Sequence, residues 1–193
     1  MSGQGSVAAV VLAAGESRRY GSPKQLAELE GRTLLEHVLE RARAAGLSPV
    51  VAVVPVWLTR PAAMSEERLV WVRNPYPERG MSHSLRLGFA ALPPDVTAAL
   101  ILLGDQPRLP QGHLRLLLEA RGRAPIVASS HAGVVSPPLL VERSHFGLVA
   151  EARGDAGLRD AIASHPELVR EVELPDPIAD VDSPPDLDAL EPG

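Results

Sequence analysis

The chain has 193 residues and carries 19 Lys and Arg against 24 Asp and Glu, a formal net charge of −5. It has no cysteine, so disulfides, thiolate metal sites and cysteine nucleophiles are excluded. The acidic balance disfavours a protein that wraps nucleic acid, no apolar run approaches the roughly 18 residues of a membrane span, and no signal segment opens the chain. We therefore expect a cytoplasmic protein with no nucleic-acid or membrane partner, and one domain over residues 1–193 with its core at about 6–190.

Short apolar runs alternate with amphipathic segments along the chain. The continuous run Val7–Leu12 is typical of a strand buried on both faces of a parallel sheet. In chain order we expect strands at 7–12, 50–54, 69–72, 98–103 and 126–128, an extended segment at 134–141 broken by Pro137 and Pro138, and helices beginning near 34, 82, 114 and 154. This order predicts an α/β fold, a single Rossmann-like three-layer αβα domain with a mainly parallel, doubly wound sheet.

The ends of two predicted strands carry the polar residues of greatest interest. Ligands of doubly wound sheets bind outside the carboxyl ends of strands, close to the point where the strand order reverses. The first loop, residues 13–24, and the pair Gly104-Asp105 both follow buried strands. We therefore expect them to face one crevice.

The first loop has the composition of a phosphate-binding turn. Residues 12–24 are Leu-Ala-Ala-Gly-Glu-Ser-Arg-Arg-Tyr-Gly-Ser-Pro-Lys. Small residues at 13–15 let the backbone approach a ligand, and exposed N–H groups suit phosphate oxygens. Arg18, Arg19 and Lys24 add positive charge, although the spacing fits neither a Walker loop nor a dinucleotide fingerprint. The alternative is a polar turn with solvated arginines.

Two residue types occur once in the chain. Lys24 is the one lysine beside 18 arginines, and Asn74 is the one asparagine. Chance is one interpretation. The other is that arginine cannot serve at position 24, because lysine is a compact point charge and arginine a wide planar fork.

Aspartates offer candidate metal ligands. Asp105 follows a buried strand beside the first loop, where a carboxylate suits Mg²⁺; its alternative is a turn aspartate that accepts local N–H groups. Asp180 and Asp182 would share one face of a short strand by alternation. Their alternative is a solvated acidic tail in which Ser183 caps a helix.

The segment 80–86, Gly-Met-Ser-His-Ser-Leu-Arg, begins a predicted helix. Hydroxyls and free N–H groups at a helix start bind anions, while the alternative is ordinary capping by Ser82. We interpret His83 as a surface or capping residue rather than a base. The other histidines lack metal-ligand spacing.

Six motifs in order resemble one family. They are residues 12–24, Asn74-Pro75, the Gly-Met-Ser-x-Ser-Leu-Arg-x-Gly segment at 80–88, Leu-Gly-Asp-Gln-Pro at 103–107, Gly154-Asp155, and Asp-Val-Asp-Ser-Pro at 180–184. Over about residues 7 to 190 the chain resembles the molybdenum-cofactor cytidylyl- and guanylyltransferases, and within that family the cytidylyltransferases most. The resemblance implies a nucleotide-diphospho-sugar transferase-like fold, Mg²⁺, and transfer of CMP from CTP to the phosphate of molybdopterin with release of pyrophosphate. A molybdoenzyme or its chaperone would be a further partner.

The resemblance also implies roles for individual residues. Arg19, Lys24 and Asp105 would be catalytic, and Asp105 and Asp182 would bind the metal. The nucleotide would contact Leu12, Ala13, Ala14, Gly15, Arg19, Lys24, Asn74, Ser82 and Asp105. Ala14 stands where guanylyltransferases commonly have a second glycine, which favours cytosine as the base. The family's usual Gly-His-Pro segment is replaced by Val-Val-Ser-Pro-Pro at 134–138.

Three alternatives stay open at this point. The chain could be a guanylyltransferase for the same cofactor, or it could activate a sugar, a polyol or another phosphorylated metabolite. It could also be a non-catalytic protein that binds and delivers the cofactor, although a pure carrier has little need of Arg19, Lys24 and Asp105 together.

Overall fold

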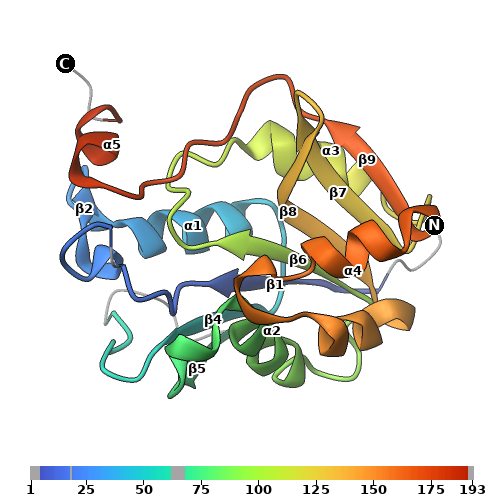
Figure 1. The fold of residues 1–193 in the computed structure, drawn as a ribbon, viewed down its shortest axis with the longest axis horizontal. Coiled ribbons are helices and arrows are strands. Elements are labelled where there is room, and N and C mark those ends of the chain that lie inside the picture. The colour runs from blue at the N-terminus through green and yellow to red at the C-terminus, as the bar shows by residue number, and fades with distance from the viewer. Residues whose placement is uncertain (1–4, 18, 62–67, 191–193) are drawn as a thin grey trace.

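A mixed seven-stranded sheet forms the centre of the molecule (Figure 1). The computed structural model describes residues 5–17, 19–61 and 68–190. The sheet order is β5-β4-β1-β6-β8-β7-β9, and β8 is antiparallel to both of its neighbours while the other pairs are parallel. The strands are β1 (Val7–Leu12), β4 (Val50–Pro55), β5 (Leu69–Asn74), β6 (Ala98–Leu103), β7 (Ile126–His131), β8 (Val134–Glu142) and β9 (Val169–Glu173).

Helices and one small hairpin complete the described part of the chain. The α-helices are α1 (Leu34–Ala44), α2 (Met81–Ala90), α3 (Gln111–Glu119), α4 (Arg159–Ser164) and α5 (Pro184–Asp188). The 3₁₀ segments are η1 (Lys24–Leu26), η2 (Pro77–Arg79), η3 (Arg143–Glu151), η4 (Gly154–Ala156) and η5 (Pro166–Leu168), and the hairpin pairs β2 (Glu28–Leu29) with β3 (Arg32–Thr33). None of the helices in these ranges is long and apolar enough to cross a membrane.

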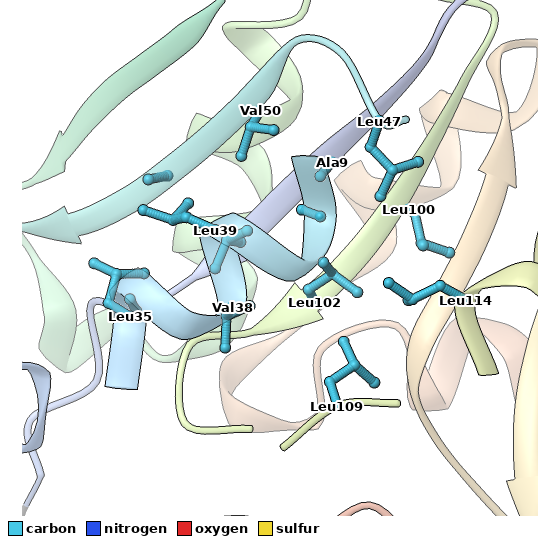
Figure 2. Packing of buried hydrophobic residues seen from close by; sticks show 14 of the residues in the cluster. Ala9, Leu35, Val38, Leu39, Leu47, Val50, Leu100, Leu102, Leu109 and Leu114 are labelled. Carbon is cyan, nitrogen blue, oxygen red and sulfur yellow. The ribbon is translucent and has the colours of Figure 1, made fainter. Parts of the chain in front are cut away.

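Helices cover both faces of the sheet, as the alternation of strand side chains requires. In β1, Val11 belongs to the core cluster formed with α1 and α3, whereas Val10 belongs to the cluster formed with α2, η3 and α4. Figure 2 shows part of the first cluster, in which Leu39 of α1 and Leu114 of α3 lie against the strands. The predicted three-layer αβα architecture with a mainly parallel sheet is therefore confirmed.

Some local predictions are wrong. Ser82 does not cap α2, because Gly80 is the N-cap residue and Ser82 is buried in the first turn with 2% exposure. The helix predicted from residue 154 begins only at Arg159, after the 3₁₀ segment η4. The 134–141 segment forms one strand, and its pairing with β7 shifts register between Ala128 and Ser129, opposite the two prolines. Residues 180–182 are not a strand.

The strand order reverses beside β1. The chain runs from β1 through α1 to β4 on one side, and it returns through α2 to β6 on the other side. Helix α2 packs very closely on this point of the sheet, since a Cβ atom at Gly88 would lie 2.5 Å from Val10 Cγ1. The sequence therefore needs a glycine in the interior of a helix, where glycine is otherwise unfavourable.

We predict that Gly88→Ala destabilises the fold by about 1–3 kcal/mol, because the added methyl overpacks the contact between α2 and β1. The control is Gly112→Ala in α3, where a Cβ atom would meet nothing within 4 Å. That variant should be neutral or stabilising, since alanine favours a helix over glycine. Urea denaturation of both variants measures the difference, and equal midpoints would contradict the packing argument.

Candidate active site

A cleft of about 600 Å³ opens at the carboxyl ends of β1 and β6. A Cβ atom at Gly104 would lie 2.7 Å from the Cβ of Ala13, so glycine lets the two strand ends lie in direct contact. Most of the predicted site residues line this cleft, namely Leu12, Ala13, Ala14, Gly15, Arg19, Lys24, Asp105 and Asp182. The predicted crevice between the first loop and Asp105 is therefore present.

The side chain of Gln25 holds the first loop in place. Its Nε2 atom donates to the carbonyl oxygens of Ala13 at 3.0 Å and Gly15 at 2.7 Å, and its Oε1 accepts from Ser17 Oγ. The Ser17 hydroxyl also accepts from the backbone N–H of Lys24, at 3.1 Å. Gln25 was not among the predicted residues, and no pattern in the sequence distinguishes it. Arg18 lies outside the described residues.

Lys24 lies between two carboxylates. Its Nζ donates to Asp105 Oδ2 at 2.5 Å and to Asp182 Oδ1 at 3.4 Å. Arg19, whose side chain is 77% exposed, bonds to the other oxygen of Asp182 at 2.8 Å. The structure thus joins the three predicted catalytic residues and the second predicted metal ligand in one network of alternating charges.

The oxygen atoms of this network suit a hard cation. Asp105 Oδ1 is buried and has no hydrogen-bond partner among the described residues, while its Oδ2 atom is bonded to Lys24. Within the described ranges, no group of three or more His, Cys, Asp or Glu side chains could hold a metal alone. Mg²⁺ commonly takes one or two carboxylates together with waters and substrate phosphates. Asp105 and Asp182 match that requirement.

A C-terminal tail brings Asp182 to the cleft. The backbone N–H of Val181 donates to the carbonyl oxygen of Asp105 at 2.9 Å, and the Val181 side chain is buried with Leu29 and Leu34. Figure 1 shows this tail crossing the molecule from β9 to α5, which lies beside β2. The tail is therefore held by a backbone hydrogen bond to Asp105 at the cleft and by the packing of Val181 against Leu29 and Leu34.

A capping box fixes the backbone next to Asp182. Asp186 Oδ2 accepts from the Ser183 hydroxyl at 2.7 Å, from the Ser183 N–H at 2.8 Å and from the Asp182 N–H at 3.1 Å. These bonds, those of Ser183 first, lower the pKa of Asp186. The sequence offered a metal ligand and a helix cap as alternatives for this segment. Both are compatible with the structure, because Ser183 caps α5 while Asp182 lines the cleft.

Asp180 also lines the cleft but has a different partner. Its Oδ1 accepts from Gln106 Nε2 at 2.8 Å. Desolvation of the carboxyl raises the pKa of Asp180; the hydrogen bond from Gln106 opposes this, and the charges of Asp105 and Asp182 add to it. Of the two candidate aspartates in the tail, Asp182 is the one bonded to Lys24.

Asn74 and Ser82 do not line the cleft. Asn74 is fully buried, and its Nδ2 donates to the hydroxyl of Ser84, which does line it. Ser82 accepts a 3.4 Å bond from Arg86 instead. The contacts of Asn74 and Ser82 with a nucleotide remain predictions. Their positions favour a role behind the cleft wall, where Asn74 holds the side chain of Ser84. His83 also lies outside the lining, and burial, followed by the charges of Arg79 and Arg86, lowers its pKa.

Several known proteins are similar to this chain in sequence or in structure. Residues 9–169 match the family model described as the MobA-like NTP transferase domain. The purine catabolism protein PucB of Bacillus subtilis strain 168 is 28% identical over 201 residues, which cover 94% of each chain. The crystal structure of Rv0371c from Mycobacterium tuberculosis H37Rv has a TM-score of 0.84 and 30% identity, and the match covers 97% of this chain and 98% of that one. A structure of Rv0371c in complex with manganese has a TM-score of 0.80 and 28% identity, with 96% and 97% covered.

We predict that Asp186→Ala loosens the tail at Asp182, because three hydrogen bonds to that segment are lost. The amide hydrogens of Val181 and Asp182 should exchange several-fold faster with solvent, measured by mass spectrometry or NMR. The control is Asp188→Ala, which removes an exposed carboxylate from the same helix. Equal exchange in the two variants would show that the capping box does not hold Asp182.

Proposed function

The chain belongs to the MobA-like NTP transferase family, and we propose that it transfers CMP from CTP to the phosphate of molybdopterin in a Mg²⁺-dependent reaction that releases pyrophosphate. The observation that carries the transferase chemistry is the network of Lys24, Asp105, Asp182 and Arg19 beside a small-residue loop. A cleft of about 600 Å³ leaves room there for a nucleoside triphosphate. The resemblance of the sequence motifs to the cytidylyltransferases supports the choice of acceptor.

Asp105 and Asp182 are the residues that would hold Mg²⁺. The fit rests on Asp105 Oδ1, which is buried and has no hydrogen-bond partner among the described residues, and on Asp182, whose carboxylate is bonded to the same Lys24 Nζ atom as Asp105. The manganese complex of Rv0371c supports a divalent cation in this group of structures. When bound, the ion would supply positive charge that offsets the charge of the phosphates as an acceptor approaches.

Lys24 and Arg19 would bind the phosphate oxygens whose charge grows in the reaction. An acceptor oxygen attacks the α-phosphorus, the bond from that phosphorus to the β-phosphate oxygen breaks, and pyrophosphate leaves with the electron pair. A positioned cation stabilises such developing charge far better than it would in water. The acceptor phosphate is already ionised, so the step needs no general base. In agreement, no described residue of the cleft lining is a histidine.

Ala14 is the basis for choosing a pyrimidine. It lies on the cleft lining, is 4% exposed and belongs to the buried cluster that contains Val10 and Leu12. A methyl on a loop that runs close to the base leaves less room for a purine than glycine would. This steric argument favours CTP over GTP.

The test is pyrophosphate release with Mg²⁺ and molybdopterin, with CTP, GTP, ATP and UTP offered separately. We expect release with CTP alone. Release with GTP alone would keep the family and overturn the argument from Ala14. A sample that binds a triphosphate but releases no pyrophosphate with any of the four would refute molybdopterin as the acceptor.

We predict that Asp105→Asn and Lys24→Ala each lower turnover by about 10²-fold or more, the scale typical of electrostatic groups in a site. The control is Asp95→Asn, which removes an exposed carboxylate near the opposite end of β6. It should retain the wild-type rate in the same pyrophosphate assay. Near-normal turnover by either folded site variant would defeat its catalytic assignment.

A further inference from the structure

A second cavity of about 160 Å³ adjoins the cleft. The two share part of their lining, including Arg159, Asp155 and Asp180. A transfer between two substrates needs two sites whose reacting groups meet at a common boundary. The cleft holds the charged network of the proposed transferase, so the second cavity is available for the other substrate.

The walls of the second cavity are mostly apolar. They include Leu85 of α2, Ile101 of β6, Leu139 of β8, and Leu158 and Ile162 at α4. Each of these side chains is buried. A cavity of this size and lining suits the faces of a flat system of one or two fused rings better than a sugar, whose hydroxyls would lack partners.

One buried polar group marks an edge of the cavity. Gln106 lines it and is 2% exposed, and its Nε2 donates to Asp180, which orients the amide. Its Oε1 is buried and has no hydrogen-bond partner among the described residues. A buried acceptor atom without a hydrogen bond lowers the stability of the fold. A ring N–H of a ligand that donates to Gln106 Oε1 would satisfy this atom.

One cation stands at the boundary between the cavities. Arg159 lines both and is exposed, and its side chain makes no hydrogen bond or ion pair with another described residue. Its neighbour Asp155 is already engaged, because its Oδ1 accepts from the backbone N–H of Met81 at 3.2 Å. Arg159 is therefore available for an anion, and guanidinium groups bind phosphate well.

We propose that the second cavity binds the ring of the acceptor substrate, and that Arg159 binds the acceptor's phosphate at the boundary with the cleft. The occupant is a flat nitrogen heterocycle that carries an N–H donor and a phosphate monoester. This inference rests on the proposed function and deepens it, since it assigns the acceptor side of the same site.

The probes are 6-hydroxymethylpterin and its monophosphate, whose ring fluorescence reports binding without any turnover. The phosphorylated probe should bind the wild-type protein more tightly than the alcohol. Arg159→Ala should lose about tenfold in affinity for the monophosphate, as expected for a charged contact, and little for the alcohol. Ala156→Phe, which fills a wall of the second cavity alone, should weaken both probes by at least about tenfold.

Matched controls are Arg153→Ala and Ala150→Phe, at exposed positions outside both linings. Both should bind the probes like the wild type. Loss of CTP binding in Arg159→Ala with an unchanged preference for the monophosphate would assign Arg159 to the nucleotide instead. Wild-type probe binding by Ala156→Phe, or no binding of either probe to the wild-type protein, would overturn the proposal. Pyrophosphate release from CTP, measured separately, tests the proposed function alone.

Discussion

β1 and β6 pair in parallel from Val7–Ala98 to Leu12–Leu103, and this pairing aligns the ends of both strands. The backbone N–H of Gly104 donates to the carbonyl of Leu12 at 2.9 Å, so the ladder continues one residue past the strands. As a result, the first loop and Asp105 follow their strands at the same level along the edge of the sheet. Every contact between Lys24 and the carboxylates depends on that alignment, since a shifted register would move Asp105 along the edge of the sheet.

The balance of charge at the cleft explains why a cation belongs to the chemistry. Five side chains that carry carboxylates line it, and three that carry cations; they are Glu16, Asp105, Asp155, Asp180 and Asp182, and Arg19, Lys24 and Arg159. Of the three cations, Lys24 and Arg19 are bonded to carboxylates. A triphosphate entering this arrangement would meet excess negative charge, and Coulomb repulsion grows as the site excludes water. A divalent ion held by the carboxylates would offset that excess and would leave Lys24 and Arg19 to the phosphates.

Much of the fold followed from local patterns, because buried parallel strands are continuous apolar runs and their helices are amphipathic. The gathering of Arg19, Lys24 and Asp105 followed from the rule for strand ends in such sheets. What could not be predicted depends on contacts distant in sequence. Gln25 looks like any surface glutamine until its amide meets two loop carbonyls. The N-cap residue of α2 is Gly80 and not the predicted Ser82. Its φ of 77° and its position against Gly154, whose carbonyl carbon would lie 2.6 Å from an added Cβ atom, are set by tertiary packing.

The two cavities are built from different kinds of structure. The nucleotide side is dominated by a loop of small residues, so its selectivity depends on backbone position and single methyl groups. The proposed acceptor side is formed by side chains of α2 and β6 together with those of β8 and α4, which later parts of the chain supply. The Val-Val-Ser-Pro-Pro segment, where the sequence departs from the family it resembles, contributes Val135, Ser136 and Pro137 to the second cavity and nothing to the lining of the cleft. A change confined to that wall can alter the fit of an acceptor while the phosphate chemistry at Lys24 and Asp105 stays as it is.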